Sequence, residues 1–512
     1  MSLKSTNPTF VYLGANAHKE LVHQLLAMDP GIRFIESAIY PEQQESRFED
    51  NLSNESVITF DSRLAIGSGE IGFTPVNGCN QVKVIDFVMC DKLLPLLWTR
   101  FNGKTRWRNH SEVKRYEVTY SLIKSAIETC ATHKPGIVIF SYEPHMLPMY
   151  IFKKVCEALG IRTCTMIVSP FIWKVFLDIV NDRNSGFQKT LLKNRGDDTS
   201  NDSVKRFIDE KKSDYSVAKP FYEKRNLGLC LGKKLIYKLK ANGWQPHKLI
   251  LGQIAFSDYK KLSTKRSELQ GIKYICVFLQ LQPEQTTLPD GGFFVHHLFA
   301  LQMLYSAVSA LGISLVVREH PATFAFGKNM KWRPRDFYSS IKNIGPNIYF
   351  DDINADPYSL IKNSIAVSAI TGTVLLEGLL QGRPAIAFGK HPLKDYAATA
   401  FVDKFEDEVE LREKVAKAIV ESPQSIIADV ENYLRNVYPT TFGPSEYIGN
   451  AKMSLEKLRE ARYHALRQVI EVIMGKTPSK TRPHDYAPEN TITECDQHND
   501  EHPAHDQVKA KI

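Results

Sequence analysis

Three short polar motifs follow apolar segments in the second half of the chain. They are Gln282-Pro283-Glu284, Arg318-Glu319-His320-Pro321, and Ser368 with Thr371-Gly372-Thr373. Each motif begins where a strand is expected to give way to a loop. Because loops after parallel strands meet at the ligand edge of an open α/β sheet, we expect the three motifs to line one binding site.

The small residues Thr371, Gly372 and Thr373 stand at the expected start of a helix. Free backbone N–H groups and the helix dipole favour an anion at such a position, and two hydroxyls can add bonds to phosphate oxygens. A phosphate-binding loop is one interpretation. The other is a simple N-cap, since threonine is common there.

His320 ends an apolar strand, and Pro321 directs the chain out of it. A donor imidazole there could hold a nucleotide phosphate and stabilise the charge of a departing nucleoside phosphate. A histidine with a structural task is the alternative.

Glu143 lies just past an apolar strand in the first half, next to Pro144 and His145. A carboxylate there could act as a general base or as a nucleophile towards an anomeric carbon. Glu143, His145 and Glu284 are therefore the candidate catalytic residues. Glu143 could equally serve only to bind loop N–H groups.

The elements that must position these residues alternate between strands and helices in two blocks. Residues 9–41 predict a strand, a turn at Gly14, a helix and a second strand; Gly14 alone is too weak a motif for a cofactor site. Residues 137–168 predict strand, loop, helix and strand, and a second alternating block over about 271–445 contains the strands "KYICVFLQLQ", "SLVVREHP", "NIYFDD", "IAVSAITG" and "PAIAFG". Such alternation indicates parallel sheets covered by helices.

A length of 512 residues favours two domains. We predict an N-terminal, acceptor-side Rossmann-like domain over 1–240, which includes a polar and basic excursion over 181–240, and a C-terminal, nucleotide-sugar-binding Rossmann-like domain over 241–445. An amphipathic helix over 446–475 and a disordered tail over 476–512 complete the prediction. The excursion could track an anionic glycan or touch a membrane, or be a solvated helix face.

Composition narrows the class of protein. Hydrophobic residues make up 43% and charged residues 24% of the chain, as in a globular protein, and a net charge of +8 is weak evidence for nucleic acid, which we do not expect as a partner. The eight cysteines show no paired spacing, and no DxD pair at a strand end, HExxH, Walker or GxSxG motif occurs. No leader or membrane span is visible. We expect a cytoplasmic protein without a catalytic metal.

The motifs in "LQLQPEQTTLPDGGFF", "LVVREHP", "RPRDFYSSI" and "SAITGTVLLEGLLQGRPAIAFG" resemble the capsule polysaccharide biosynthesis family, which includes bacterial retaining β-Kdo transferases. The resemblance implies an α/β fold of the GT-B type, with two doubly wound domains facing a cleft. It also implies that Gln282 and Glu284 shape the donor site and that His320 meets the donor phosphate. The segment "EGLLQGRP" resembles, in addition, a general GT-B pattern in which a helix glutamate, here Glu377, binds ribose or sugar hydroxyls.

The resulting expectation is a glycosyltransferase of capsule or lipopolysaccharide synthesis. It would need no cofactor beyond its nucleotide-sugar donor, with CMP-Kdo as one candidate, and would act on a glycan or glycolipid acceptor at the inner face of the membrane, in contact with polysaccharide export machinery. A polyol-phosphate transferase, a sugar-nucleotide epimerase and a non-catalytic assembly partner are the alternatives. Donor, linkage and stereochemistry stay open at this point.

Overall fold

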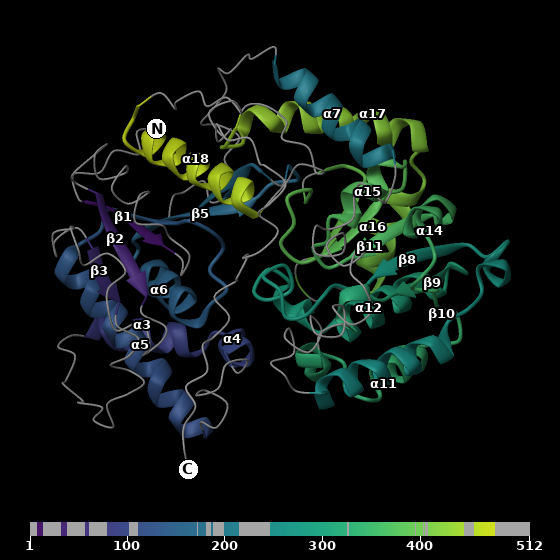
Figure 1. Ribbon diagram of the computed structural model, residues 1–512, viewed down its shortest axis with the longest axis horizontal. Helices are drawn as coiled ribbons and strands as arrows, with labels where there is room; N and C mark the ends of the chain where they lie inside the picture. The colour runs from purple at the N-terminus through teal and green to yellow at the C-terminus, as the bar shows by residue number, and fades with distance from the viewer. Residues whose placement is uncertain are drawn as a thin grey trace, which may run out of the picture.

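The computed structural model describes residues 8–13, 32–37, 57–60, 79–101, 111–171, 173–180, 186–187, 199–213, 246–324, 327–394, 396–402, 404, 408–444 and 455–476. These residues form two α/β units, each built around its own sheet (Figure 1). The expected fold class is confirmed.

The first sheet has the strand order β3-β2-β1-β4-β5-β6-β7 among the described residues. Its strands are β1 (Thr9–Leu13), β2 (Ile32–Ser37), β3 (Val57–Phe60), β4 (Ile137–Phe140), β5 (Arg162–Val168), β6 (Val175–Val180) and β7 (Gly186–Phe187). Pairing is parallel from β3 to β5 and antiparallel for β6 and β7. The strand order reverses between β1 and β4, so the loop after β4 starts at a topological switch point.

The second sheet is parallel throughout, with the order β10-β9-β8-β11-β12-β13 in the described part of the chain. Its strands are β8 (Tyr274–Phe278), β9 (Ser314–Arg318), β10 (Ile348–Phe350), β11 (Ala366–Ala369), β12 (Ala385–Phe388) and β13 (Thr399–Val402). Here the order reverses between β8 and β11. Their carboxyl ends carry two of the three motifs of the second half.

Helices cover both faces of the first sheet. One face packs against α3 (Cys79–Met89), α4 (Leu94–Phe101), α5 (Glu112–His133) and α6 (Leu147–Ala158). The other face packs against α18 (Leu455–Ile473), which contributes Leu466, Val469 and Ile470 to a core with Val11, Phe34 and Ile139. The last helix among the described residues therefore completes the core of the first unit, as the yellow ribbon beside β1 and β5 shows (Figure 1).

The second sheet is also covered on both faces. On one side lie α11 (Pro246–Leu262), α12 (His297–Ser309), α13 (Phe337–Lys342) and α16 (Glu408–Ile419). On the other side lie α7 (Thr199–Ser213), α14 (Pro357–Asn363), α15 (Val374–Leu380) and α17 (Pro423–Val437). The short 3-10 helices described here are η2 (Arg266–Leu269), η3 (Gly292–Val295), η4 (Pro321–Thr323), η5 (Gly327–Trp332) and η6 (Tyr438–Thr440).

Helix α7 lies within residues 181–240, the segment predicted to be a polar and basic excursion of the first domain. It carries Val204, Phe207 and Ile208 at helical spacing, and these side chains pack into the second unit with Phe171 and Trp173. The domain boundary at 240/241 stays a prediction. The helix expected after Gly14, residues 214–245 with their basic stretch, and the tail after 476 lie outside the described residues.

Candidate functional site

Gln282 anchors a buried polar network below the second sheet edge. Its side-chain oxygen accepts hydrogen bonds from His297 Nδ1 at 2.7 Å and from Arg333 Nη1, while its Nε2 donates to the Val295 carbonyl. Gln282 is 3% exposed. Its side chain therefore shapes the loop after β8 from within, and its part in a donor site stays a prediction.

Arg333 and Glu319 form the centre of this network. Arg333 Nε donates to Glu319 Oε2 at 2.6 Å, and Tyr338 donates to the same oxygen at 2.9 Å. The other oxygen, Oε1, accepts from the His320 backbone N–H at 2.8 Å. Glu319, the residue before His320, is thus the buried counter-ion of Arg333, and its bond to the His320 N–H fixes the direction of the chain at the strand end.

Arg318 points into the protein. Its guanidinium pairs with the fully buried carboxylate of Asp351 and donates to three backbone carbonyls, those of Asp352, Ile353 and Ala355. These bonds hold the loop after β10. A nucleotide contact by Arg318 stays a prediction, and the structure assigns the side chain to this loop.

His320 begins the short helix η4, with Pro321 as its first residue. The His320 Nδ1 accepts the Ala322 backbone N–H at 3.2 Å, so the proton of the neutral ring sits on Nε2. Burial lowers the pKa of His320; Glu319 opposes this shift, and Arg333 and Arg318 add to it. A neutral N–H donor, and not an imidazolium, is what this ring offers a phosphate at neutral pH.

The Thr371 loop is joined to the end of β8. The Thr371 backbone N–H donates to Gln280 Oε1 at 2.8 Å, and the Thr371 hydroxyl donates to the Thr286 carbonyl. Thr373 begins α15 without a side-chain capping bond, so the N-cap alternative receives no support. The two motifs on either side of the second switch point are brought together as expected, whereas phosphate binding by Thr371, Gly372 and Thr373 stays a prediction.

Glu377 on α15 and Ser368 on β11 are buried within the second unit. Glu377 Oε1 is 3.6 Å from Lys211 Nζ, which α7 supplies, and the pKa of Glu377 is raised by burial against the lowering effect of that ammonium. Ser368 is fully buried in β11. Lys211 lies in the segment 181–240, so sequence reasoning gave no sign of this pair.

Glu143 lies at the first switch point, in the loop after β4. It is 6% exposed; Oε1 accepts from Lys153 Nζ at 3.3 Å, and Oε2 has no hydrogen-bond partner among the described residues. His145 turns back, with Nδ1 3.0 Å from the Glu143 carbonyl oxygen. Glu143 is thus a buried carboxylate with an unsatisfied oxygen, not one satisfied by loop N–H groups, and such a group requires an explanation.

The second unit reaches Glu143 through Lys390, which follows β12. Lys390 Nζ is 3.9 Å from Glu143 Oε2 and forms an ion pair with Asp178 on β6. The Lys390 backbone N–H donates to the Asp290 carbonyl at 2.8 Å. We call Glu143, Lys153, Asp178, Asp290 and Lys390 the interunit charge cluster; it combines three carboxyl groups and two ammonium groups from both units.

Sequence reasoning found Glu143 but missed the other four members of the cluster. Two signals were available: Asp290 is in the same loop as Gln282-Pro283-Glu284, and Lys390 directly follows the expected strand "PAIAFG". Glu284 itself opens the turn of that loop, where its carbonyl accepts the Thr287 and Leu288 N–H groups. A catalytic contact by Glu284 or His145 stays a prediction.

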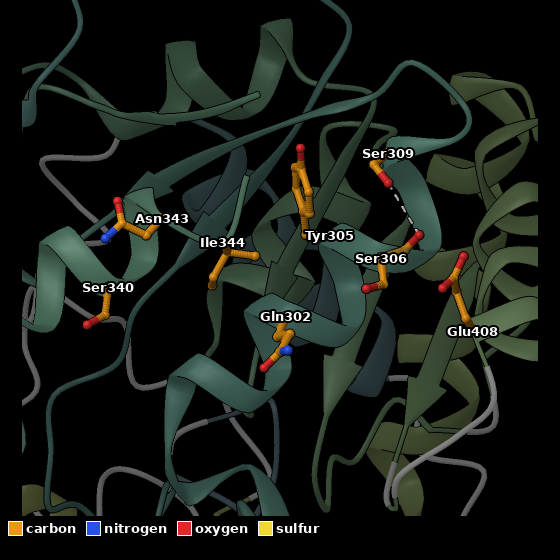
Figure 2. A pocket seen from close by; sticks show the side chains of 8 residues that line it. All are labelled: Gln302, Tyr305, Ser306, Ser309, Ser340, Asn343, Ile344 and Glu408. Carbon is orange, nitrogen blue, oxygen red and sulfur yellow. Dashed lines mark hydrogen bonds between the residues drawn. The ribbon is translucent and has the colours of Figure 1, made fainter. Parts of the chain in front are cut away.

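A polar groove of about 600 Å³ lies elsewhere, between α12, α13 and the start of α16 (Figure 2). Gln302, Tyr305, Ser306, Asn343 and Glu408 contribute to its lining. It contains none of the predicted site residues. The interunit charge cluster and the second sheet edge are therefore the candidate site.

Within the described ranges, no group of three or more histidine, cysteine, aspartate or glutamate side chains could hold a metal ion. No helix in those ranges has the length and apolar character needed to cross a membrane.

Two doubly wound units that meet at the ligand edges of their sheets define a GT-B-like α/β protein. Residues 186–394 match the model of the family described as "Capsule polysaccharide biosynthesis protein". No curated protein matches the chain in sequence.

Several solved structures are similar to the chain. They include the β-Kdo 2,7-transferase KpsC of Thermosulfurimonas dismutans, with 12% identity, coverage of 60% of this chain and 89% of that chain, and a TM-score of 0.29. The UDP-GlcNAc 2-epimerase of Methanocaldococcus jannaschii has 11% identity, coverage of 83% and 99%, and a TM-score of 0.27. The α,α-trehalose-phosphate synthase of Burkholderia vietnamiensis has 11% identity, coverage of 92% and 100%, and a TM-score of 0.30.

Proposed function

We propose that the protein is a glycosyltransferase of capsule or related surface polysaccharide synthesis. It takes a nucleotide-sugar donor at the edge of the second sheet and a glycan or glycolipid acceptor at the edge of the first. The family match of residues 186–394 supports the biological setting. The observation that carries the chemistry is the unsatisfied buried oxygen of Glu143 at the boundary between the two units.

In this proposal, Glu143 accepts the proton of the acceptor hydroxyl as that oxygen attacks the anomeric carbon. Lys153 keeps the carboxylate oriented through the 3.3 Å contact with Oε1, which leaves Oε2 for the substrate. His320 donates its Nε2 proton in a hydrogen bond to a donor phosphate oxygen. CMP-Kdo is the first donor to test, because the motifs of the second half resemble those of β-Kdo transferases. We further propose that the protein acts at the inner face of the membrane, in contact with polysaccharide export machinery.

The direct test is a transfer assay with CMP-Kdo and with UDP- and GDP-linked sugars, using a surface glycan as acceptor. Glu143→Gln should lower kcat by about 10²- to 10⁴-fold, the usual range for loss of a general base. Glu128→Gln is the matched control, because Glu128 is exposed on α5 and its nearest ammonium, Lys124, lies 3.8 Å away. Full turnover by Glu143→Gln would remove Glu143 from the mechanism.

The product of the same assay separates the alternatives. A glycoside supports the proposal, a phosphodiester indicates polyol-phosphate transfer, and an epimerised free nucleotide sugar indicates an epimerase. Transfer at an unchanged rate in excess EDTA is expected, since the sequence predicts no metal. Calorimetric titration with CMP, CDP, UDP and GDP, repeated on His320→Ala, measures donor binding alone, and absence of any binding would favour a non-catalytic assembly partner.

A further inference from the structure

The polar groove of the second unit is separate from the candidate site. It lies between the second half of α12, the end of α13 and the start of α16 (Figure 2). Helix α12 leads into the amino end of β9, and α13 leads into the amino end of β10. The groove is therefore displaced towards the edge of the sheet opposite the one that carries the three motifs. Its volume of about 600 Å³ is in the usual range for a small-molecule site.

Most side chains that line the groove have polar groups without a partner in the protein. Two of them are bonded, because Ser309 Oγ donates to the Ser306 carbonyl at 3.4 Å and Glu408 accepts from Arg412. Five lining side chains form no hydrogen bond with another residue in the described ranges: Gln302, Tyr305, Ser306, Ser340 and Asn343. Amide and hydroxyl groups both donate and accept hydrogen bonds, so these side chains can meet a ligand that does the same.

The charge of the lining disfavours an anion. Among the described residues that line the groove there is one carboxylate, Glu408, and no lysine, arginine or histidine. A phosphate or a nucleotide is bound most strongly by cationic side chains. Amides, hydroxyls and a carboxylate instead suit the hydroxyl groups of an uncharged sugar, and Ile344 and the Tyr305 ring offer apolar surface to its C–H groups.

The surrounding elements hold the groove in shape. A Cβ at Gly345, just after α13, would lie 2.0 Å from the Tyr305 ring. Tyr305 thus occupies space that a glycine leaves open, and this close approach fixes the ring in the lining. Arg412 Nε donates to the Ala307 carbonyl at 3.1 Å and joins α16 to α12 beside Glu408. A preformed groove lowers the entropy that a ligand loses on binding.

We propose that this groove is a second glycan-binding site, which takes uncharged sugar units of the acceptor or product chain. The inference rests on the proposed function for the origin of the glycan, whereas sugar binding itself needs no transfer. The reacting end of the chain is at the edge that carries His320, and an uncharged segment of the same chain binds in the groove. Because two linked contacts raise the effective concentration of each other, a long chain binds more tightly than a short one.

The test is a titration followed by saturation-transfer NMR, with uncharged methyl glycosides of glucose, galactose, rhamnose and N-acetylglucosamine and with glucose 1-phosphate as the anionic comparison. We expect an uncharged glycoside to bind the wild type more tightly than glucose 1-phosphate does. Gln302→Ala and Ser340→Ala should each weaken that binding, and together by about tenfold or more. The matched controls are Gln253→Ala, at an exposed glutamine of α11, and Ser339→Ala, whose hydroxyl donates to the Asp336 carbonyl at 2.8 Å.

Equal binding by the groove variants and their controls would overturn the proposal, as would tighter binding of glucose 1-phosphate or no sugar binding at all. The outcome is distinct from that of the proposed function, because binding is measured without a donor. If sugars bind in the groove and no donor is turned over, the proposed function fails and the glycan site stands. In an active enzyme, Gln302→Ala with Ser340→Ala should raise KM for a long acceptor about tenfold more than KM for a disaccharide acceptor.

Discussion

At the scale of single residues, breaking the ion pair between Arg333 and Glu319 tests whether it stabilises the end of the strand before His320. Both side chains are buried, and Nε to Oε2 measures 2.6 Å. Removal of one partner leaves an uncompensated buried charge, so Arg333→Met should cost about 3–5 kcal/mol of unfolding free energy in urea titration. Arg412→Ala, at the exposed pair with Glu408, should cost less than about 1 kcal/mol. Equal losses would contradict the structural assignment.

His391 makes acid stability a second test at this scale. The His391 ring is buried and hydrogen-bonds to the backbone of Gly372, and its Nδ1 accepts the Leu393 N–H at 3.1 Å. Burial lowers the pKa of His391 to about 4 from an ordinary 6.5. The folded state therefore binds fewer protons than the unfolded state between these values. Its contribution is present above pH 6.5 and is lost as pH falls towards 4, by about 3 kcal/mol in total.

The check is the slope of unfolding free energy against pH. His391→Gln should flatten the slope between pH 6.5 and 4, whatever its effect on stability at pH 7. His297, whose pKa burial lowers in the same direction, contributes its own slope and is present in both proteins. An unchanged slope would mean that folding does not lower the pKa of His391.

The residue types that mark the candidate site could be predicted only in part. Gln282, His320 and Glu143 stand out because a polar residue directly follows an apolar run. Arg333 and Lys390 could not be assigned, since their partners are 14 and more than 200 positions away in the chain. Lone charged residues are usually solvated, and only folding shows which of them are buried together.

At the scale of elements, α18 offers the sharpest test, because the last helix fills the core of the first unit. Ile470 is fully buried against the face of the sheet that includes Ile139. Ile470→Ala should therefore cost about 2–5 kcal/mol and speed amide hydrogen exchange in β1 and β4. Arg467→Lys, on the exposed side, keeps the charge that pairs with Glu471 and should change neither. Faster exchange confined to the second sheet would contradict this packing.

The sequence predicts most of these elements but not where each one packs. Alternating apolar segments place β4 and β8 to β12 well, since a buried parallel strand reads as a β-branched run. The amphipathic stripe of α18 shows that the helix packs on something, without showing on what. For α7, the apolar triad of Val204, Phe207 and Ile208 was outweighed by the polar residues around it.

At the scale of the whole molecule, contacts far apart in sequence join the two units. The segment after α17 leaves the second unit and enters the core of the first, where Val175 on β6 pairs with Phe442 in a short antiparallel bridge and Lys174 Nζ donates to the Pro444 carbonyl at 2.9 Å. Lys390 is the charged connection, because its ammonium from the second unit meets Asp178 and Glu143 of the first. We therefore expect the position of the two units and the protonation of the interunit charge cluster to be coupled.

A double-mutant cycle between Lys390 and Asp290 measures this coupling. Burial and the negative charge of Glu143 raise the pKa of Asp290 to about 8. Lys390→Met leaves three carboxyl groups with one ammonium, so the variant should lose more stability at pH 9, where Asp290 ionises, than at pH 6. In the Lys390→Met background, Asp290→Asn should restore part of the loss at pH 9, with a coupling of about 0.5–3 kcal/mol. Additive effects at both pH values would show that the two side chains act independently, and the charge cluster would then not link the two units.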